Sequence, residues 1–458
     1  MENYWDESVE GSVISNGNEI LLTTEPSSSS FCVETQNRDH RGSGRIATVF
    51  LIVNAALGAG LLNVPQAFDQ AGGIGTALTV QAVLLVWIVG ALLILAKCAE
   101  DVGATNLQEV LAALSGNTGL IACSVVVALY CFGTCVTFLI IIGDQFDRVL
   151  SSLRGADFCH YWYMNRRFTI SISSVCLILP LCYSRRIDFL KYVSSVGVGA
   201  VLYVVALIVY EKYTGGFIPG PIKTVPDHWT DVFLVVPVIC FGYQCHVSII
   251  PIYSCLRHRN MRNFTCSSMT AIAVCVICYS IAGVFGYLTF GSNVAIDILL
   301  GYGGSNPLVL FGIAAIAIKT FTTYPILLFC GREAVSTLLT FVPWLRSNDV
   351  AVTERKRRII IASIWFFLSL IFSVIIPDIQ IVISILGSLA AVFIFIFPGI
   401  CLLQSTLHRD PFIILNIDRI FILLASLFFL LGAFIIGVVI SQIPEEIAKE
   451  SSKTLLCT

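Results

Sequence analysis

From about residue 46 to residue 440, long apolar runs alternate with short polar stretches. Most runs reach the ~20 residues that a helix needs to cross ~30 Å of hydrocarbon. The pattern predicts eleven transmembrane helices, of which the fourth is short: 46–70, 74–98, 118–146, 168–183, 188–210, 231–255, 267–290, 307–330, 358–376, 379–403 and 411–440. Composition agrees, because 57% of the residues are hydrophobic and 12% charged, which excludes a water-soluble globular domain. The predicted fold class is an all-α polytopic protein of a lipid membrane.

The two tails are polar. Residues 1–45 are Ser- and Gly-rich and lack an apolar core with a cleavage site, which predicts a disordered cytosolic tail rather than a signal peptide. With a cytosolic amino terminus, seventeen of the 27 Lys and Arg residues fall in cytosolic segments and eight in exoplasmic ones. This bias satisfies the positive-inside rule and places the tail 441–458 on the exoplasmic or lumenal side.

Two of the predicted spans contain helix-disfavouring residues at their centres. The first span reads NAALGAGLLNVP over residues 54–65, and the sixth is interrupted at Cys240-Phe-Gly-Tyr243. Lipid offers backbone groups no hydrogen bonds, so a broken helix survives there only beside other protein or around a polar cavity. Paired broken helices in corresponding positions are typical of the substrate site of a secondary transporter.

The spacing of the breaks predicts two five-helix inverted repeats, residues 46–210 and 231–403, followed by an eleventh helix over 411–440. An odd number of spans per repeat inverts the second copy, so the two breaks would face each other near the midplane. The halves share no obvious residue identity, so the prediction rests on position.

The first break offers groups of both polarities. The N–H groups around Gly58, Ala59, Gly60 and Leu61 begin the outer half-helix and suit a carboxylate. The carbonyls from Asn54 to Leu57 end the inner half-helix and suit a cation. A zwitterionic amino acid needs both. The alternative is that Gly58-x-Gly60 is only a close helix-packing contact.

Polar residues in the later spans are further candidates. Lys319, Thr322 and Thr323 share one helical face, where hydroxyls suit sodium or substrate and an ammonium would mimic a bound cation or shuttle a proton. The alternative is that Lys319 is incidental. His246 is a candidate pH sensor, and a pH-silent packing histidine is slightly favoured. Asp144 and Asp147 are expected to mark a helix end in water.

Other function classes lack support. The net charge is −2, and no basic patch with interleaved aromatic residues predicts nucleic-acid binding. No nucleophile–base pair predicts an enzyme, and the cysteines within apolar spans are interpreted as packing residues rather than metal ligands. No cofactor is expected beyond a bound sodium ion. Cys159 and Cys457 alone lie in predicted exoplasmic segments, where one disulfide is conceivable.

Several strings resemble the sodium-coupled neutral amino acid transporters of solute carrier family 38, within the amino acid/auxin permease group: NAALGAGLLNVPQAFDQAGG (54–73), FGTCVTFLIIIGDQ (132–145), ICFGYQCHVSIIPIY (239–253), GYLTFGSNV (286–294), TYPILLFCGR (323–332) and ILGSLAAVFIFIFPGICLL (385–403). The resemblance covers almost the whole membrane part, and the second and third strings are its most specific parts. It implies a LeuT-like fold, glutamine or asparagine as substrate, and a lysosomal membrane, with the plasma membrane as the alternative. Glu19-Ile-Leu21-Leu22 is similar to an acidic dileucine sorting signal, although its acid lies closer to the leucines than usual.

The family's site roles carry over to matching positions. The backbone of Gly58, Ala59 and Gly60 would hold the substrate carboxylate, with Phe241 and Gly242 on the amine side. Asn54 and Leu57 with Thr322 and Thr323 would match the sodium site. Lys319 departs from the family pattern. This departure favours proton coupling, or transport without a coupling ion, over sodium coupling.

The function predicted from the sequence is secondary active transport of small neutral amino acids by alternating access, from the lumen or exterior to the cytosol, coupled to sodium or protons. A membrane amino-acid sensor with little net transport is the first rival. A channel is the second, although no repeated pore loop or ring of carbonyls is evident.

Overall fold

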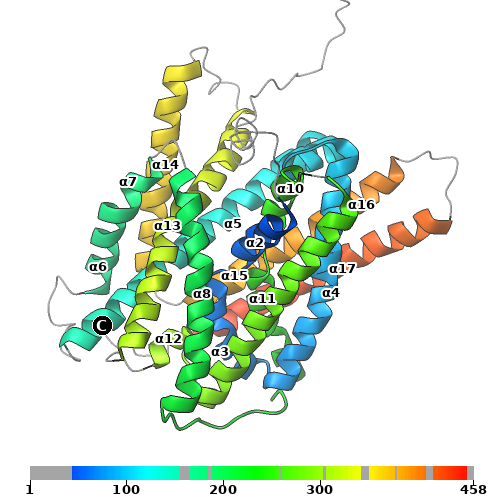
Figure 1. Cartoon of the computed structure of the whole chain (residues 1–458). Coiled ribbons are helices and arrows are strands. Elements are labelled where there is room, and N and C mark those ends of the chain that lie inside the picture. Colours follow the sequence, from blue (N-terminus) through cyan, green and yellow to red (C-terminus); the bar gives the residue numbers. More distant parts are fainter. Residues whose placement is uncertain are drawn as a thin grey trace, which may run out of the picture.

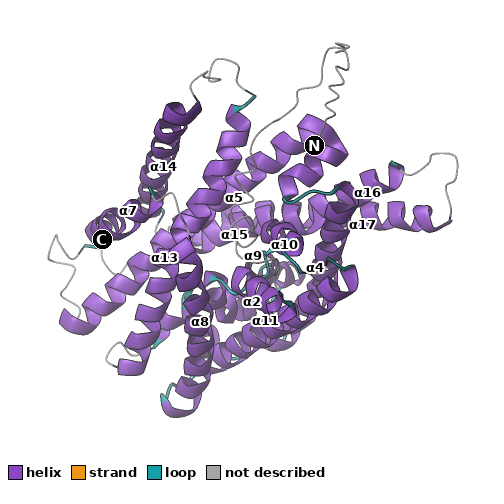
Figure 2. Ribbon diagram, turned by 45° about the horizontal axis from the view of Figure 1, so that its top comes forward, coloured by secondary structure: helices purple, strands orange, loops and turns teal. Residues whose placement is uncertain are grey.

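The structure is a computed structural model, and it describes residues 44–154, 165–183, 188–257, 259–302, 306–341, 350–376, 379–408 and 416–450. The expected cytosolic tail, the sorting motif, Cys159 and Cys457 lie outside the described residues. Every regular element in the described ranges is a helix (Figure 2). This agrees with the predicted all-α class.

The amino-terminal half forms α2 (Arg45–Ala56), η2 (Ala59–Asn63), α3 (Val64–Gln70), α4 (Ile74–Val102), α5 (Leu107–Arg154), α6 (Arg166–Ser173), η5 (Ser174–Ile178), α7 (Leu179–Cys182) and α8 (Asp188–Thr214). The carboxyl-terminal half forms η6 (Trp229–Phe233), α9 (Val235–Gly242), α10 (His246–Ser254), α11 (Met261–Phe290), η7 (Gly291–Asn293), α12 (Ile298–Gly301), α13 (Pro307–Leu339), α14 (Val350–Ile375), α15 (Ile379–Ala391), η9 (Val392–Ile396), α16 (Phe397–Leu407) and α17 (Asn416–Glu450).

Local sequence explains several helix ends. The side chains of Asn165, Asn260 and Asn306 each accept a hydrogen bond from the backbone N–H two residues further on, which caps α6, α11 and α13. Gly103 ends α4 with φ 70°, a left-handed conformation that glycine adopts without strain. Gly116, with φ 65°, kinks α5 close to residue 118, where the third span is predicted to start.

Within the described residues, nine helices are long and apolar enough to cross a membrane, and the bent pair Arg45–Ala56 and Gly60–Gln70 makes a tenth. The fourth predicted span, 168–183, appears as α6, η5 and α7. Together these elements are shorter than the ~20 residues that a straight span needs. The count of eleven therefore stays a prediction, and the protein is an all-α polytopic membrane protein.

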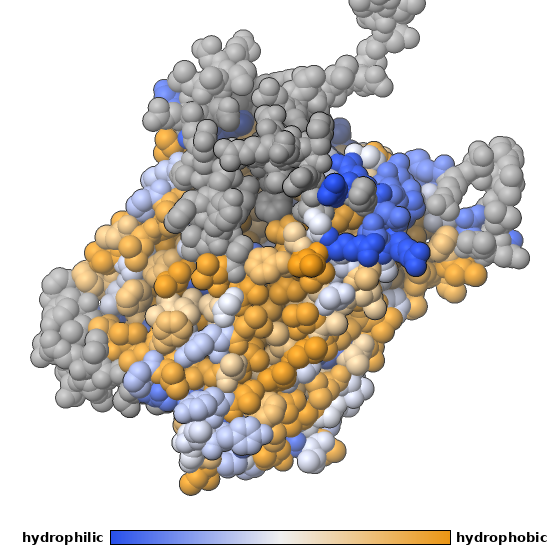
Figure 3. Space-filling view, in the orientation of Figure 1, coloured by the Kyte–Doolittle hydropathy of each residue, from blue (hydrophilic) through white to orange (hydrophobic). Residues whose placement is uncertain are grey.

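The broken helices lie inside the bundle, and the last helix lies outside it. In Figure 1, α2, α3 and α10 are flanked by α4, α8 and α11, while α17 crosses behind them. In the most apolar window of Trp229–Ser254, 78% of residues are buried, against 28% in the window of α17. The visible face carries a broad hydrophobic band that ends at a hydrophilic area near the end of α4 (Figure 3). The band suits contact with lipid.

The third span extends further than predicted. Helix α5 continues past residue 146 to Arg154, so Asp144 and Asp147 do not mark its end. Arg166 of α6 forms ion pairs with both carboxylates, and Asp144 is only 8% exposed. The expectation of a water-exposed helix end is wrong, because an arginine distant in the sequence allows these carboxylates to lie among packed helices.

Candidate functional site

The first break lies between α2 and η2. The Leu57 N–H still donates to the Val53 carbonyl at 2.7 Å, and the chain then becomes extended at Gly58 (φ −111°, ψ −164°). The two halves are bent by 56°. A Cβ atom built on Gly58 would meet no atom within 4 Å, so open space adjoins the break. Pro65 fits the first turn of α3, where a missing N–H costs no intrahelical bond.

The second break lies between α9 and α10. The Tyr243 N–H donates to the Ile239 carbonyl at 3.0 Å, which ends α9, and α10 starts at His246. The outer half α3 packs against α9, and the inner half α2 packs against α10. The two broken spans therefore run antiparallel, as the inverted arrangement predicts.

The two breaks are in direct contact. A Cβ atom on Gly60 would lie 3.2 Å from Cδ1 of Phe241 and 3.3 Å from Cα of Gly242. Leu61 is buried beside them, and the side chain of Ala59 lies outside the described part of the chain. The structure thus brings together Gly60, Phe241 and Gly242, which the sequence assigned to one site although about 180 residues separate them.

A tyrosine hydroxyl bridges the two breaks. The hydroxyl of Tyr279, from α11, lies 3.0 Å from the Ala56 carbonyl and 2.9 Å from the Gly242 carbonyl. Both carbonyls end a half-helix and have lost their intrahelical partners. The single hydroxyl proton can serve only one of them at a time. Tyr279 therefore links the inner half of the first broken span to the outer half of the second.

Lys319 binds the neighbouring carbonyl group by a hydrogen bond. Its Nζ donates to the carbonyl oxygen of Leu57, the next residue after Ala56, and the lysine is 8% exposed. The ammonium thus lies at an oxygen that the sequence assigned to the coupling ion. Thr322 and Thr323 follow on the next turn, where their hydroxyls donate to carbonyls of their own helix, including that of Lys319 at 2.9 and 2.8 Å. Asn54 lies half-buried near the end of α2.

A glycine of α8 makes room for the lysine stem. A Cβ atom on Gly197 would lie 2.8 Å from Cγ of Lys319, whereas one on Gly199, also in α8, would meet no atom within 4 Å. The stem of Lys319 therefore lies against the bare backbone of α8. This contact fixes the direction in which the ammonium points.

We expect Gly197→Ala to displace Lys319 and to lower transport severalfold, because a contact of 2.8 Å at Cγ cannot be relieved by moving the ammonium alone. Gly199→Ala is the matched control, since it adds the same methyl group two residues further along α8 without a clash. Radiolabelled amino-acid uptake by the two purified variants measures the difference. Equal uptake by both would contradict the packing role of Gly197.

His246 begins the inner half α10 and is fully buried. Its Nδ1 lies 2.9 Å from Oε1 of Gln244, within the second break. This local hydrogen bond suits the packing interpretation. A role as pH sensor would need the bundle to open and admit water, and it stays a prediction.

Aromatic side chains adjoin the break on the side of α5. The rings of Tyr130 and Phe241 lie 6.4 Å apart, and those of Tyr130 and Phe393 lie 5.5 Å apart with their planes at 75°. Such tilted and edge-to-face pairs are the favoured arrangements of aromatic rings. Tyr130 is half-buried and lines this side of the break together with Phe241.

Comparison with known proteins now identifies the family. The family model described as "transmembrane amino acid transporter protein" matches residues 41–442. The chain belongs to this family. It is 40% identical to sodium-coupled neutral amino acid transporter 7 of Danio rerio over 92% of both chains. It is 39% identical to the protein of that name from Homo sapiens over 87% of both. It is also 34% identical to human solute carrier family 38 member 8, over 78% of this chain and 84% of that one.

These relatives place the chain in solute carrier family 38. It is thus a multi-pass membrane protein of amino acid transport, a transporter rather than an enzyme. Among solved structures, MhsT in complex with L-phenylalanine matches with a TM-score of 0.52, covering 86% of this chain and 99% of that one at 14% identity. At this identity the likeness shows a shared fold alone, which agrees with the LeuT-like architecture expected from the sequence.

A lid segment packs against this transporter's first broken span. The lid segment comprises residues 291–302, including η7 and α12. Asn63 Nδ2 donates to the Ile296 carbonyl at 2.9 Å, and Ser292 Oγ donates to Asp69 at 2.8 Å. Both bonds join the lid to the outer half of the first broken span. Moving that half outward would break them.

A buried carboxylate joins the lid segment to α5. Asp297 is 1% exposed, and its two oxygens accept hydrogen bonds from the Leu299 N–H and the Gln145 amide, each at 2.8 Å. Burial, followed by the nearby charge of Asp144, raises the pKa of Asp297 to about 7, while the Leu299 N–H, the Gln145 amide and the charge of Arg148 act in the opposite direction. The carboxyl is thus protonated in an acidic compartment.

The raised pKa of Asp297 predicts that the stability of the protein depends on pH. In the unfolded chain Asp297 loses its proton near pH 4, but in the folded protein it keeps the proton up to about pH 7. The folded state binds more protons between these values, so stability should fall as the pH rises from about 4 to 7. We expect the melting temperature to fall by a few degrees more in the wild type than in Asp297→Asn between pH 5 and pH 8. Parallel melting curves for the two proteins would show that Asp297 does not titrate in this range.

The sequence did not point to Tyr279, Gly197 or Tyr130. A tyrosine in an apolar span looks like a packing residue, although the need of a buried hydroxyl for a partner is a usable signal. Gly197 lies in a Gly-x-Gly pair, which is common wherever membrane helices pack closely. Gln145 belongs to a string that carried the family resemblance, but the lid segment that it contacts is distant in the sequence.

Proposed function

We propose that this transporter carries small neutral amino acids, with glutamine or asparagine as the main substrates, from the lumen or exterior to the cytosol. Alternating access would take place around the two breaks. The observation that carries the proposal is the direct contact of Gly60 with Phe241 and Gly242, beside the open space at Gly58. The relatives' names, which specify neutral amino acids, support the substrate class.

The chemistry of the breaks suits a zwitterion. The first N–H groups of the outer half-helix at Gly58, Ala59, Gly60 and Leu61 would bind the carboxylate, since the N-terminus of a helix carries partial positive charge. Phe241 and Gly242 would line the amine side. The proposal includes two five-helix repeats, 46–210 and 231–403, followed by the helix 411–440. It also includes a cytosolic amino terminus.

We further propose that the coupling ion is a proton rather than sodium. The relatives are named sodium-coupled, and the family resemblance implies a sodium site at Asn54, Leu57, Thr322 and Thr323. In this chain, however, the Lys319 ammonium already binds the Leu57 carbonyl. A cation that is covalently part of the protein occupies the oxygen that sodium would use, and lysine can accept and release protons when its surroundings change. Sodium coupling is the rival.

A lysosomal membrane is the proposed location, with the plasma membrane as the alternative. The dileucine-like motif at Glu19 to Leu22 supports it, and a lumen rich in protons would supply the proposed coupling ion. Replacing Leu21 and Leu22 by alanine in the full chain should move a fluorescent fusion from lysosomes to the cell surface. An unchanged distribution would remove this support.

Counterflow tests the transport proposal. Proteoliposomes loaded with unlabelled glutamine should accumulate labelled glutamine saturably and above its external concentration. Empty proteoliposomes and proteoliposomes of a Gly60→Leu variant are the controls. Binding of one molecule per protein without accumulation would favour the sensor, and accumulation that does not saturate would favour the channel.

A further inference from the structure

Amide side chains form a row on the outer half of the first broken span. Asn63, Gln66 and Gln70 are spaced i, i+3 and i+7, so they share one side of this half-helix. The row starts three residues after Gly60 and runs away from the break. The proposed orientation places its far end at the lumenal or exterior side.

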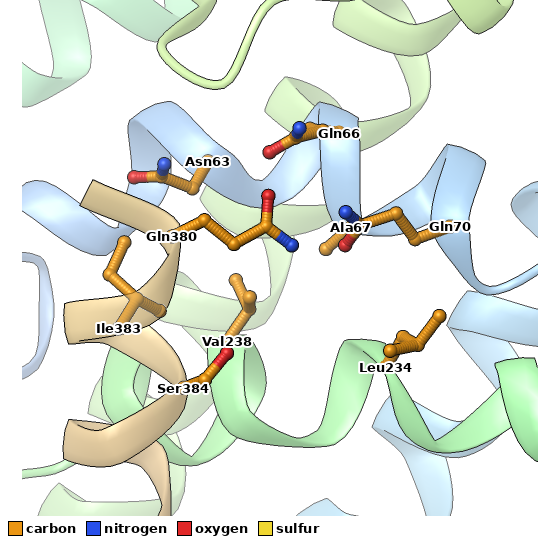
Figure 4. Close-up of a pocket in the computed structure, with 9 residues that line it drawn as sticks. All are labelled: Asn63, Gln66, Ala67, Gln70, Leu234, Val238, Gln380, Ile383 and Ser384. Carbon is orange, nitrogen blue, oxygen red and sulfur yellow. The ribbon is translucent and has the colours of Figure 1, made fainter. Parts of the chain in front are cut away.

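The row faces a small pocket between three helices. Leu234 and Val238 come from the outer half of the second broken span, and Gln380 and Ser384 come from α15. In Figure 4 the amides of Gln66 and Gln70 extend from α3 towards the amide of Gln380 on the opposite helix. Two helices that are far apart in the sequence therefore present amides to the same space.

Some of these amides have unused hydrogen-bonding groups. Asn63 is 3% exposed and donates to the Ile296 carbonyl, but its Oδ1 is buried without a partner among the described residues. Within the same part of the chain, the half-buried amides of Gln66 and Gln70 make no hydrogen bond. A primary amide provides two N–H donors and one carbonyl acceptor, so the pocket offers both kinds of group.

The amide groups of the pocket lining, and the absence of charged side chains among its described residues, favour some ligands over others. None of the described residues that line the pocket carries a charge, so neither a carboxylate nor an ammonium finds an opposite charge there. An apolar side chain would cover the amides and leave them unpaired, which is unfavourable. A primary carboxamide pairs its own N–H and C=O groups with those of a facing amide. Leu234 and Val238 suit the methylene groups that carry such a carboxamide.

We propose that this pocket is a selectivity subsite for the carboxamide end of an amino acid, distinct from the backbone groups of the break. The inference rests on the proposed function, because Asn63 and Val238, which line the pocket, lie only three residues from Gly60 and Phe241 of the proposed substrate site. It assigns Gln66 and Gln380 to the choice between glutamine or asparagine and smaller neutral amino acids. These residues would act on the apparent affinity for the side chain and not on the coupling ion.

The test compares two substrates in variants of the full chain reconstituted into proteoliposomes. Gln66→Leu and Gln380→Leu, alone and together, keep the side-chain volume and remove the amide. We expect the double variant to raise the KM for glutamine about tenfold, since each lost hydrogen bond changes affinity by about threefold to tenfold. The KM for alanine should change by less than about twofold. Gln404→Leu, in α16, is the matched control and should alter neither value.

The outcomes separate this inference from the proposed function. One outcome overturns the subsite alone. In it, the wild type takes up glutamine saturably, but the variants change the KM for glutamine and the KM for alanine equally or change neither. Absence of saturable glutamine uptake by the wild type overturns the proposed substrate and the subsite with it. Size-exclusion profiles check folding, and each single variant repeats the comparison if the double variant aggregates.

Discussion

Replacing Lys319 by serine is expected to make transport depend on sodium. In the wild type the ammonium binds the Leu57 carbonyl, so no free cation is needed at that oxygen. Serine removes the ammonium and its stem and supplies one more hydroxyl, next to those of Thr322 and Thr323. Carbonyl and hydroxyl oxygens together are suitable ligands for sodium. Uptake by the variant in choline should be about tenfold or more below its uptake in sodium.

Lys319→Met is the matched control for the serine variant. It keeps the length of the side chain and fills the space beside Gly197, but it leaves the Leu57 carbonyl without a donor and provides no sodium ligand. Loss of a buried hydrogen-bond partner costs about 1–3 kcal/mol. The methionine variant should therefore be inactive in sodium and in choline alike. Two variants with the same ion dependence as the wild type would show that Lys319 lies outside the coupling mechanism.

Replacing Gly60 by leucine is expected to abolish substrate binding while the protein stays folded. A Cβ atom at this position already lies 3.2–3.3 Å from Phe241 and Gly242, so a leucine must push the two broken spans apart and cover the N–H groups beside it. Overpacking of this kind costs about 1–3 kcal/mol, which a helix bundle of this size should tolerate. Equilibrium binding and uptake of labelled glutamine measure the effect.

Gly199→Leu serves as the comparison for Gly60→Leu. Gly199 is exposed on α8 and has no neighbour within 4 Å, so the same side chain enters open space there. It should bind and transport like the wild type. Gly60→Ala should give an intermediate loss, because the ring of Phe241 can yield by a few tenths of an ångström. Normal uptake by Gly60→Leu would remove Gly60 from the substrate site.

The sequence predicted the breaks because their residues are unusual in an apolar helix. Gly58, Gly60 and Pro65 disfavour a continuous helix, and a second interruption at Cys240 to Tyr243 follows about five spans later. The structure shows both interruptions, and it shows them in contact. Their assignment to substrate and ion stays a prediction, as does the boundary of each repeat.

The sequence could not predict the contacts that depend on tertiary packing. Neither the role of Gly197 beside Lys319 nor the bridge from Tyr279 to both breaks follows from local patterns, since each joins residues from different spans. The error at Asp144 has the same origin, because its partner Arg166 lies in another helix. That the short segment around 168–183 crosses the whole bilayer stays a prediction, since hydropathy alone does not fix how a helix crosses the bilayer.

We propose that an ammonium of the protein itself replaces the sodium ion at the first break. Uptake of labelled glutamine into proteoliposomes tests it most directly, with sodium replaced by choline and the pH gradient varied independently. If the ammonium replaces sodium, uptake should be saturable, persist in choline and increase as the exoplasmic side is made more acidic. Uptake that collapses in choline and ignores the pH gradient would contradict it.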